Sequence, residues 1–220
     1  MSTLAILPVK SFGAAKQRLA PALGGGSRRA LAQAMLSDVL DSLGRMAGLD
    51  AVLVVTADRM AASVARNAGA QVVPDTEQAG QSPAASLGIS HARTRGFERV
   101  LLVPGDTPLL DPGEVDDLLR RAREQQLGIV VVPDRHGEGT NALLLSPPDV
   151  IEPSFGPGSL QRHIEAAAAS GVAHRVERVP SLMLDIDTGY DLTELVRVLE
   201  NCHGHAPSTR DALRRAAVPA

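Results

Sequence analysis

Residues 100–110 read VLLVPGDTPLL, an apolar run of strand length that ends in a Gly-Asp turn. The run itself, Val100–Pro104, carries no polar side chain, which is typical of a strand covered on both faces. Three other runs are almost as apolar: Leu4–Val9, Ala51–Thr56 and Ile129–Pro133. Together these runs predict a sheet that is buried on both faces.

Stretches with helical patterning separate the strand-like runs along most of the chain. We expect helices at Ser27–Met46, Arg59–Asn67, Ala84–Thr94, Glu114–Gln126, Ser159–Ala169 and Tyr190–Asn201, and further strands at Gln71–Pro74, Ala142–Leu145 and Val172–Val179. Alternating strands and helices predict an α/β, three-layer domain with a mainly parallel sheet and helices on both faces. The later segments read as hairpin-like strands and a closing helix, so we expect a mixed sheet with an antiparallel edge.

The chain length and this pattern predict one domain over residues 1–202 and a C-terminal extension over residues 203–220. The extension reads as a loose terminus with a short helix at Arg210–Ala217. It contains His203 and His205, which could bind a metal adventitiously; we favour a solvated terminus.

Composition excludes several classes of protein. A formal net charge of −3 at pH 7, with three Phe, one Tyr and no Trp, argues against a nucleic-acid binder. The single cysteine, Cys202, excludes internal disulfides and fits a reducing compartment. The N-terminus has no basic region ahead of its apolar run, and no stretch approaches the roughly 20 apolar residues of a membrane helix. We therefore expect a soluble, cytoplasmic protein that binds neither nucleic acid nor a membrane.

The loop after the first run contains both lysines of the chain, Lys10 and Lys16, although Lys and Arg together number 22. Ligands of open α/β sheets bind beyond the carboxyl ends of the strands, where this loop lies. A compact ammonium group is a common point-charge ligand for phosphate oxygens. The loop predicts a phosphate contact, with solvated surface charge as the alternative. Nearby, Gly24-Gly25-Gly26 lacks the spacing of a phosphate-binding loop, so we interpret it as a flexible loop before an N-cap at Ser27.

Carboxylates follow two of the apolar runs. Asp106 comes directly after Val100–Pro104, where a hard oxygen ligand would suit Mg²⁺ bridging substrate phosphates. Asp185 and Asp187 would point to the same face of an extended chain and could add a second ligand. The alternatives are an Asx turn at Asp106 and a helix cap at Asp187.

Two glycine-containing segments could receive an anion. Phe155-Gly156-Pro157-Gly158-Ser159 precedes an expected helix, whose N-terminal amides favour negative charge. Residues 136–141, HGEGTN, place Thr140 and Asn141 as polar donors between two expected strands. Both segments could equally be ordinary turns. His163, on the helix after Ser159, could contact a substrate, but a lone histidine is more often structural.

Taken in order, these motifs resemble the CofC/FbiD family, the guanylyltransferases of coenzyme F(420) biosynthesis. The resemblance runs from about Leu4 to Leu195 and rests on five motifs. The motifs are V-K-x(4)-A-K-x-R-L-A-P from Val9, G-D-x-P-x-L from Gly105, G-x-G-T-x-A from Gly137, F-G-P-x-S from Phe155 and D-x-D-T from Asp185. The G-D-x-P-x-L and D-x-D elements are shared with other nucleotidyltransferases. One departure is Gln81-Ser82, where the family usually has Leu-Asn, because Ser82 lacks the paired donor and acceptor of an amide.

The resemblance implies a three-layer, Rossmann-like nucleotidyltransferase fold that uses Mg²⁺, GTP and a small phosphorylated three-carbon acid. Carried over by position, Lys16, Arg18 and Asp106 are the expected catalytic residues, and Asp106 and Asp187 hold Mg²⁺. The nucleotide-binding residues are Pro8, Lys10, Lys16, Ser82 and Gly105, and the acid-binding residues are Thr140, Gly156 and Ser159. An unstable product would pass to the next enzyme of the pathway, and a homodimer is one candidate assembly.

The expected reaction moves GMP from GTP to phosphoenolpyruvate, because the Arg- and Ala-rich composition favours the bacterial branch. The same reaction on 2-phospho-L-lactate or 3-phosphoglycerate is the alternative. Other hypotheses are a nucleotidyltransferase for a sugar phosphate or the molybdenum cofactor, and a non-catalytic nucleotide-binding regulator. The first usually shows a Gly-Gly-rich loop after the first strand, where this chain has Pro8-Val9-Lys10-Ser11, and the retained Asp106 and Asp187 argue against the second.

Overall fold

The structure is a computed structural model that describes residues 1–13, 16–201 and 204–216. Ala15 of the first motif, Cys202 and His203 lie outside the described residues. Seven strands form one sheet in the order β3-β2-β1-β4-β6-β5-β7. The strands are β1 (Thr3–Pro8), β2 (Ala51–Thr56), β3 (Gln71–Pro74), β4 (Arg99–Leu102), β5 (Ile129–Pro133), β6 (Thr140–Leu145) and β7 (His174–Val176).

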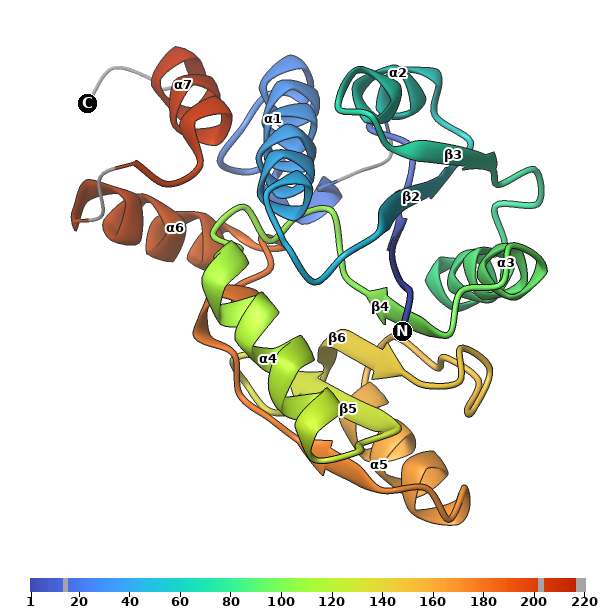
Figure 1. The fold of residues 1–220 in the computed structure, drawn as a ribbon. Coiled ribbons are helices and arrows are strands. Elements are labelled where there is room, and N and C mark those ends of the chain that lie inside the picture. The colour runs from blue at the N-terminus through green and yellow to red at the C-terminus, as the bar shows by residue number, and fades with distance from the viewer. Residues whose placement is uncertain (14–15, 202–203, 217–220) are drawn as a thin grey trace.

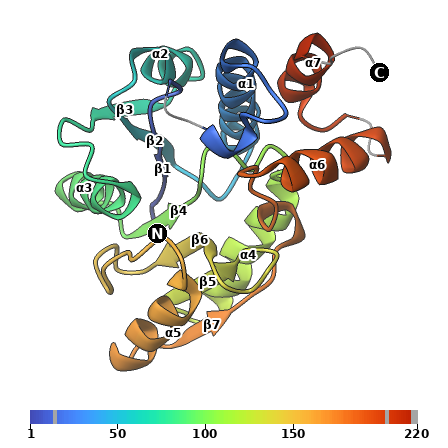
Figure 2. The ribbon, with the colours of Figure 1, turned by 180° about the vertical axis from the view of Figure 1, so that it is seen from behind.

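Helices cover both faces of the sheet, which confirms the predicted three-layer α/β class (Figure 1). The α-helices are α1 (Gly25–Gly44), α2 (Arg59–Asn67), α3 (Gln81–Thr94), α4 (Pro112–Glu124), α5 (Ser159–Ala169), α6 (Gly189–Asn201) and α7 (Pro207–Ala216). Two single-turn 3-10 helices, η1 (Gln17–Leu19) and η2 (Pro180–Leu182), lie in connections. Seen from opposite sides, α4 and α5 lie on opposite faces of the same strands (Figures 1 and 2).

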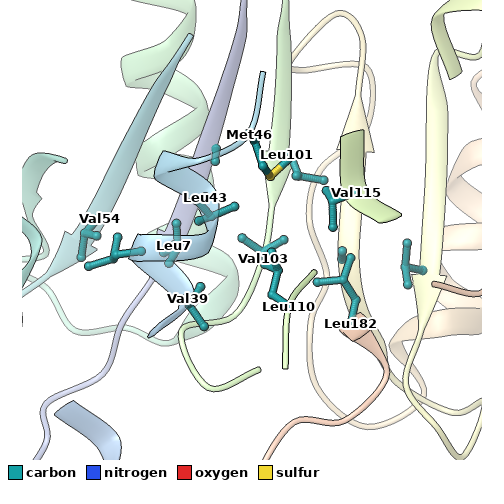
Figure 3. Packing of buried hydrophobic residues seen from close by; sticks show 14 of the residues in the cluster. Leu7, Val39, Leu43, Met46, Val54, Leu101, Val103, Leu110, Val115 and Leu182 are labelled. Atoms are coloured by element: carbon teal, nitrogen blue, oxygen red, sulfur yellow. The ribbon is translucent and has the colours of Figure 1, made fainter. Parts of the chain in front are cut away.

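Alternate residues of each strand enter different cores, as the two-residue period of a strand requires. In β1, Ala5 and Leu7 join one cluster with side chains of α1, α2 and α4, whereas Leu4 and Ile6 join another with side chains of α3 and α5. Figure 3 shows the first cluster, where Leu7 packs beside Val39 and Leu43 of α1. Burial on both faces explains why these strands have so few polar residues.

The antiparallel part of the sheet differs from the prediction. β6 runs antiparallel to both neighbours, β4 and β5, and it lies inside the sheet. The edge strand β7 runs parallel to β5, so the expected antiparallel edge is wrong. The β5–β6 connection is a hairpin, as predicted, but the sheet is extended on both sides of that hairpin.

Several helices start earlier than predicted, among them α3, which begins at Gln81 and not at Ala84. α1 begins at Gly25 with Gly24 in the N-cap position, so Ser27 lies inside the first turn and does not cap the helix. α4 begins at Pro112, and the Asp111 side chain caps it by accepting a hydrogen bond from the Glu114 amide. Proline suits the first turn of a helix, which explains this earlier start.

The C-terminal segment packs against α1, whereas we expected a loose extension with a shorter helix. α7 lies beside α1 in both ribbon views (Figures 1 and 2), and Ala206 and Thr209 are buried. The buried Asp38 carboxylate of α1 accepts hydrogen bonds from the Ser208 and Thr209 amides, at 3.0 and 2.7 Å. A third cluster joins these elements to the loop after β1 and to the segment before α6.

We expect Asp38→Ala to lower the free energy of unfolding by about 2 kcal/mol, because it removes a helix cap and leaves two amides unpaired. Urea denaturation of the variant checks this, with Asp41→Ala, an exposed position on the same helix, as the control. A variant as stable as the wild type would show that α7 does not depend on this cap.

In the part of the chain that the structure describes, no helix has both the length and the apolar character needed to cross a membrane.

Candidate active site

A cavity of about 860 Å³ opens at the edge of the sheet where β1 and β4 end. Its lining contains all the predicted site residues except Ser82: Pro8, Lys10, Lys16, Arg18, Gly105, Asp106, Thr140, Gly156, Ser159 and Asp187. These residues come from five separate segments of the sequence. β1 and β4 run parallel and end at this edge, and the antiparallel β6 begins there, so the sheet brings together the segments around Pro8, Gly105 and Thr140.

The loop after β1 is held by Asp58, a residue outside the predicted site. One carboxylate oxygen of Asp58 accepts hydrogen bonds from the Met60 and Ala61 amides and caps α2. The other accepts from the Phe12 amide at 2.8 Å and from the Ser11 hydroxyl at 3.1 Å. Burial opposes the charge, but these donors hold the pKa of Asp58 below its usual value. The capping pattern before α2 was visible in the sequence, whereas the bond to the distant loop was not.

Lys16 occupies a backbone conformation that most residues avoid, with φ at 58°. Its carbonyl accepts a hydrogen bond from the Leu19 amide, and Leu19 is fully buried in the third cluster. Leu184 and Ile186 belong to the same cluster. This packing therefore ties the turn that carries Lys16 to the segment that carries Asp187.

The Lys16 ammonium bridges Asp106 and Asp187. It contacts the Asp106 carboxylate directly and lies 2.9 Å from Oδ1 of Asp187. The backbone helps to set this arrangement, because the Ile186 amide donates to the Asp106 carbonyl at 3.3 Å. Two carboxylates from distant segments thus face one cation.

Asp187 is free for this contact because another residue starts the following helix. Thr188 precedes α6, and its hydroxyl accepts a hydrogen bond from the Asp191 amide while the Asp191 carboxylate accepts from the Thr188 amide. This reciprocal pair is a capping box. The alternative interpretation of Asp187 as a helix cap is therefore wrong.

The charges around this cluster shift its acidities. Burial works against the charged form of Lys16, but Asp106 and Asp187 outweigh it and hold the pKa of Lys16 above its usual value. Burial likewise opposes ionisation of Asp187, yet Lys16, Arg18 and Lys10 hold its pKa below the usual range. Asp185 lacks such a cation: burial, together with Asp106 and Asp187, raises its pKa to about 6. Asn141 donates a hydrogen bond to Asp185 at 3.2 Å, and both side chains line the cavity.

The N-terminus of α5 forms another part of the cavity wall. Gly156, with φ at 110°, and Gly158, with φ at 70°, take conformations that favour glycine and turn the chain into the helix. Ser159 is 1% exposed, and its hydroxyl has no hydrogen-bond partner among the described residues. An unpaired buried hydroxyl at a helix N-terminus that lines a cavity is suited to an anion.

Ser82 lies outside the cavity lining. Its hydroxyl accepts a hydrogen bond from the Phe155 amide at 2.8 Å and supports the loop that carries Gly156. The neighbouring residues Asp75, Gln78 and Gln81 line the cavity instead. Its place where the family usually has Asn gave no signal of this role.

His163 is fully buried on α5, one turn after Ser159, and it is not part of the cavity lining. Its ring nitrogens contact the Thr140 hydroxyl at 2.9 Å and the Ser154 amide at 2.8 Å. Burial and then the charge of Arg162 lower the pKa of His163 from its usual 6.5 to about 4.

This shift predicts a loss of stability in acid. Between pH 6.5 and 4 the unfolded chain binds a proton at this position and the folded chain does not, so the stabilisation present above pH 6.5 disappears as the pH falls. The expected loss is roughly 3 kcal/mol. Urea denaturation at pH 7 and pH 4.5 should show a larger loss for the wild type than for His163→Gln. Equal losses would contradict the assignment.

The donor set fits a divalent cation shared with a ligand. Because one ammonium contacts both Asp106 and Asp187, a single cation can lie between the two carboxylates. Across the residues that the structure describes, no group of three or more His, Cys, Asp or Glu side chains could hold a metal by itself. Mg²⁺ in nucleotide enzymes usually takes one or two carboxylates and completes its shell with substrate phosphates and water.

A family model described as "Guanylyl transferase CofC like" matches residues 3–219. The chain belongs to this family. The match includes α7 as well as the segments that surround the cavity, and it confirms the resemblance seen in the sequence motifs.

Named relatives agree with this membership. The phosphoenolpyruvate guanylyltransferase of Conexibacter woesei is 49% identical over 215 residues, covering 98% of this chain and 96% of that protein. The 2-phospho-L-lactate guanylyltransferase of Methanothermobacter thermautotrophicus is 33% identical over 215 residues, covering 98% of this chain and 91% of that protein. This CofC-like chain is therefore a nucleotidyltransferase enzyme.

The fold also matches solved structures. A protein of Desulfovibrio desulfuricans, provisionally described as a nucleotide-diphospho-sugar transferase, superposes with a TM-score of 0.77 at 20% identity. The match covers 98% of this chain and 95% of that one. At this identity the likeness supports the nucleotidyltransferase fold alone.

Proposed function

We propose that this chain transfers GMP from GTP to the phosphate of phosphoenolpyruvate, in the biosynthesis of coenzyme F(420). The products would be enolpyruvyl-2-diphospho-5'-guanosine and pyrophosphate. The observation that carries the proposal is one cavity with two kinds of wall. Its lining contains a lysine that bridges two carboxylates and, in a separate segment, an unpaired buried hydroxyl at a helix N-terminus. The 49% identical relative named for phosphoenolpyruvate supports this choice of acid.

The carboxylate side suits the nucleotide. Asp106 and Asp187 would hold Mg²⁺, and Lys16 would leave them to contact the GTP phosphates together with Arg18. Pro8, Lys10 and Gly105 line the same part of the cavity and would contact the nucleotide. The chemistry that Mg²⁺ supplies when bound is neutralisation of the charge on the reacting phosphates.

The α5 side suits the acid. Thr140, Gly156 and Ser159 would hold its phosphate and carboxylate through hydroxyl and amide donors. An oxygen of this phosphate attacks the α-phosphorus of GTP, and the bond to the β-phosphate oxygen breaks to release pyrophosphate. The attacking phosphate is largely ionised near pH 7, since its second pKa is about 6, so the reaction needs no general base. Positioning and charge neutralisation would supply the catalysis.

Pyrophosphate release with GTP and Mg²⁺ tests the proposal. Phosphoenolpyruvate, 2-phospho-L-lactate and 3-phosphoglycerate are offered in parallel, with ATP as the control nucleotide and the next pathway enzyme as a trap for unstable product. We expect release with GTP and phosphoenolpyruvate. Preference for 2-phospho-L-lactate, which the 33% identical relative is named for, would keep the reaction and change the acid. No release with any acid would overturn the function.

A further inference from the structure

The His163 ring is held between two polar partners inside the protein. Its Nε2 lies 2.8 Å from the Ser154 amide nitrogen, and its Nδ1 lies 2.9 Å from the Thr140 hydroxyl. The Phe155 ring packs against it in an edge-to-face arrangement, with centroids 5.3 Å apart and planes at 71°. The side chain is fully buried, so water does not compete for either nitrogen.

These two contacts fix where the imidazole proton resides. A backbone amide can only donate, so Nε2 must accept from Ser154 and carry no proton. The neutral ring then carries its proton on Nδ1 and donates to the Thr140 oxygen. A second proton on Nε2 would oppose the Ser154 amide, which agrees with the lowered pKa of His163.

The Thr140 oxygen therefore accepts a hydrogen bond from the His163 ring, while the hydroxyl proton remains available to another acceptor. Among the residues that the structure describes, it has no other hydrogen-bond partner than His163. Thr140 begins β6 and lines the same cavity as the carboxylate pair. A hydroxyl that already accepts from a histidine can offer its own proton to an anion in that cavity.

We propose that His163 is a positioning residue that fixes the Thr140 hydroxyl as a hydrogen-bond donor to the acceptor acid. The chain of donors runs from the Ser154 amide through the imidazole to Thr140 and then to the acid. The inference rests on the proposed function, because it assigns the donor to the acid subsite. It also explains why a histidine that never reaches the cavity lies one turn below Ser159.

A merely structural role is the competing explanation. Arg162 also ties the loop before α5 to the helix, because it donates to the Ser154 hydroxyl and carbonyl, each at 2.8 Å, and to the Pro157 carbonyl at 2.6 Å. Loss of His163 could therefore loosen this loop without any effect through Thr140. The test must separate these two consequences.

Two substitutions each keep one of the two hydrogen bonds of the His163 ring and remove the other. In His163→Asn the amide nitrogen can occupy the place of Nδ1 and donate to Thr140, whereas the bond to Ser154 is lost. In His163→Gln the side-chain amide oxygen can take the place of Nε2 and accept the hydrogen bond from the Ser154 amide. The hydrogen bond from the ring to Thr140 is lost. We expect His163→Gln to weaken binding of phosphoenolpyruvate about tenfold, measured as KM and by calorimetry, with the KM for GTP unchanged. His163→Asn should recover most of this loss.

The double variant decides whether His163 acts through Thr140. Thr140→Val with His163→Gln should bind the acid no worse than Thr140→Val alone, since the removed donor has nothing left to orient. Additive losses, or a larger loss in His163→Asn than in His163→Gln, would overturn the inference and favour the structural role.

Nitrogen NMR of the uniformly labelled protein supplies a readout that needs no substrate. The His163 ring, assigned by its absence from the His163→Gln spectrum, should show a protonated Nδ1 and a bare Nε2 at pH 7. The opposite tautomer would overturn the inference.

If phosphoenolpyruvate neither binds nor reacts, the proposed function and this inference fall together. If the acid reacts but the losses add, only the inference fails.

Discussion

Asp106→Asn is expected to lower the rate of guanylyl transfer by roughly 10²–10³-fold, the cost of removing one charge-stabilising group from a reaction centre. The substitution keeps the size and shape of the side chain and removes one of the two carboxylates that face the cation position. It should leave the fold intact, since Asp106 lies at the cavity and outside the apolar clusters.

Pyrophosphate release under saturating GTP, acid and Mg²⁺ measures the effect. Asp117→Asn is a matched control, because Asp117 is exposed and pairs only with Arg120 within the described part of the chain. Thermal unfolding and the far-ultraviolet circular dichroism spectrum of the Asp106 variant should match those of the control. A variant that keeps a near-normal rate would remove Asp106 from the metal site.

Lys16→Met is expected to have two opposed effects. Transfer should slow by roughly 10²-fold, because the ammonium that would neutralise the GTP phosphates is lost. Binding of Mg²⁺ without nucleotide should become tighter, because Lys16 competes with a divalent cation for Asp106 and Asp187. Two close carboxylates without a counter-charge also repel each other, so Mg²⁺ should raise the melting temperature of the variant more than that of the wild type.

The other lysine supplies the comparison for this experiment. Lys10 lines the cavity but forms no ion pair with either carboxylate in the described structure, so Lys10→Met should raise the KM for GTP without tightening the binding of Mg²⁺. Calorimetric titration with Mg²⁺ in the absence of nucleotide checks both variants. Equal affinities for Mg²⁺ in the wild type and Lys16→Met would show that the lysine does not compete with the metal.

Local pattern was enough to predict the layers of the fold. Apolar runs such as Ala51–Thr56 and Ile129–Pro133 have the observed strand boundaries, because a strand covered on both faces has little freedom in its composition. The position of β6 was not predictable in this way. Its apolar residues would fit an edge or an interior place equally well, and pairing with β4 depends on contacts between distant segments.

Site residues were predictable where the charge of the side chain and its place after a strand indicate a ligand. Asp106 and Lys16 stand in turns after strands, and the fold brings them together. Residues that act through distant contacts gave no such signal. Asp58 reads as a helix cap but also holds the Phe12 amide, and Ser82 reads as a nucleotide contact but holds the Phe155 amide. The bond from Asp38 to the start of α7 spans most of the chain, so the packing of α7 could not be read from local pattern.

Transfer of the α-phosphate label of GTP tests the central claim most directly. The protein is incubated with GTP labelled at the α-phosphorus, Mg²⁺ and phosphoenolpyruvate, and the products are quenched and separated before and after phosphatase treatment. We expect the label to move into a phosphatase-resistant compound, with one pyrophosphate released for each label transferred. Label that stays in GTP or appears only as GMP would contradict it.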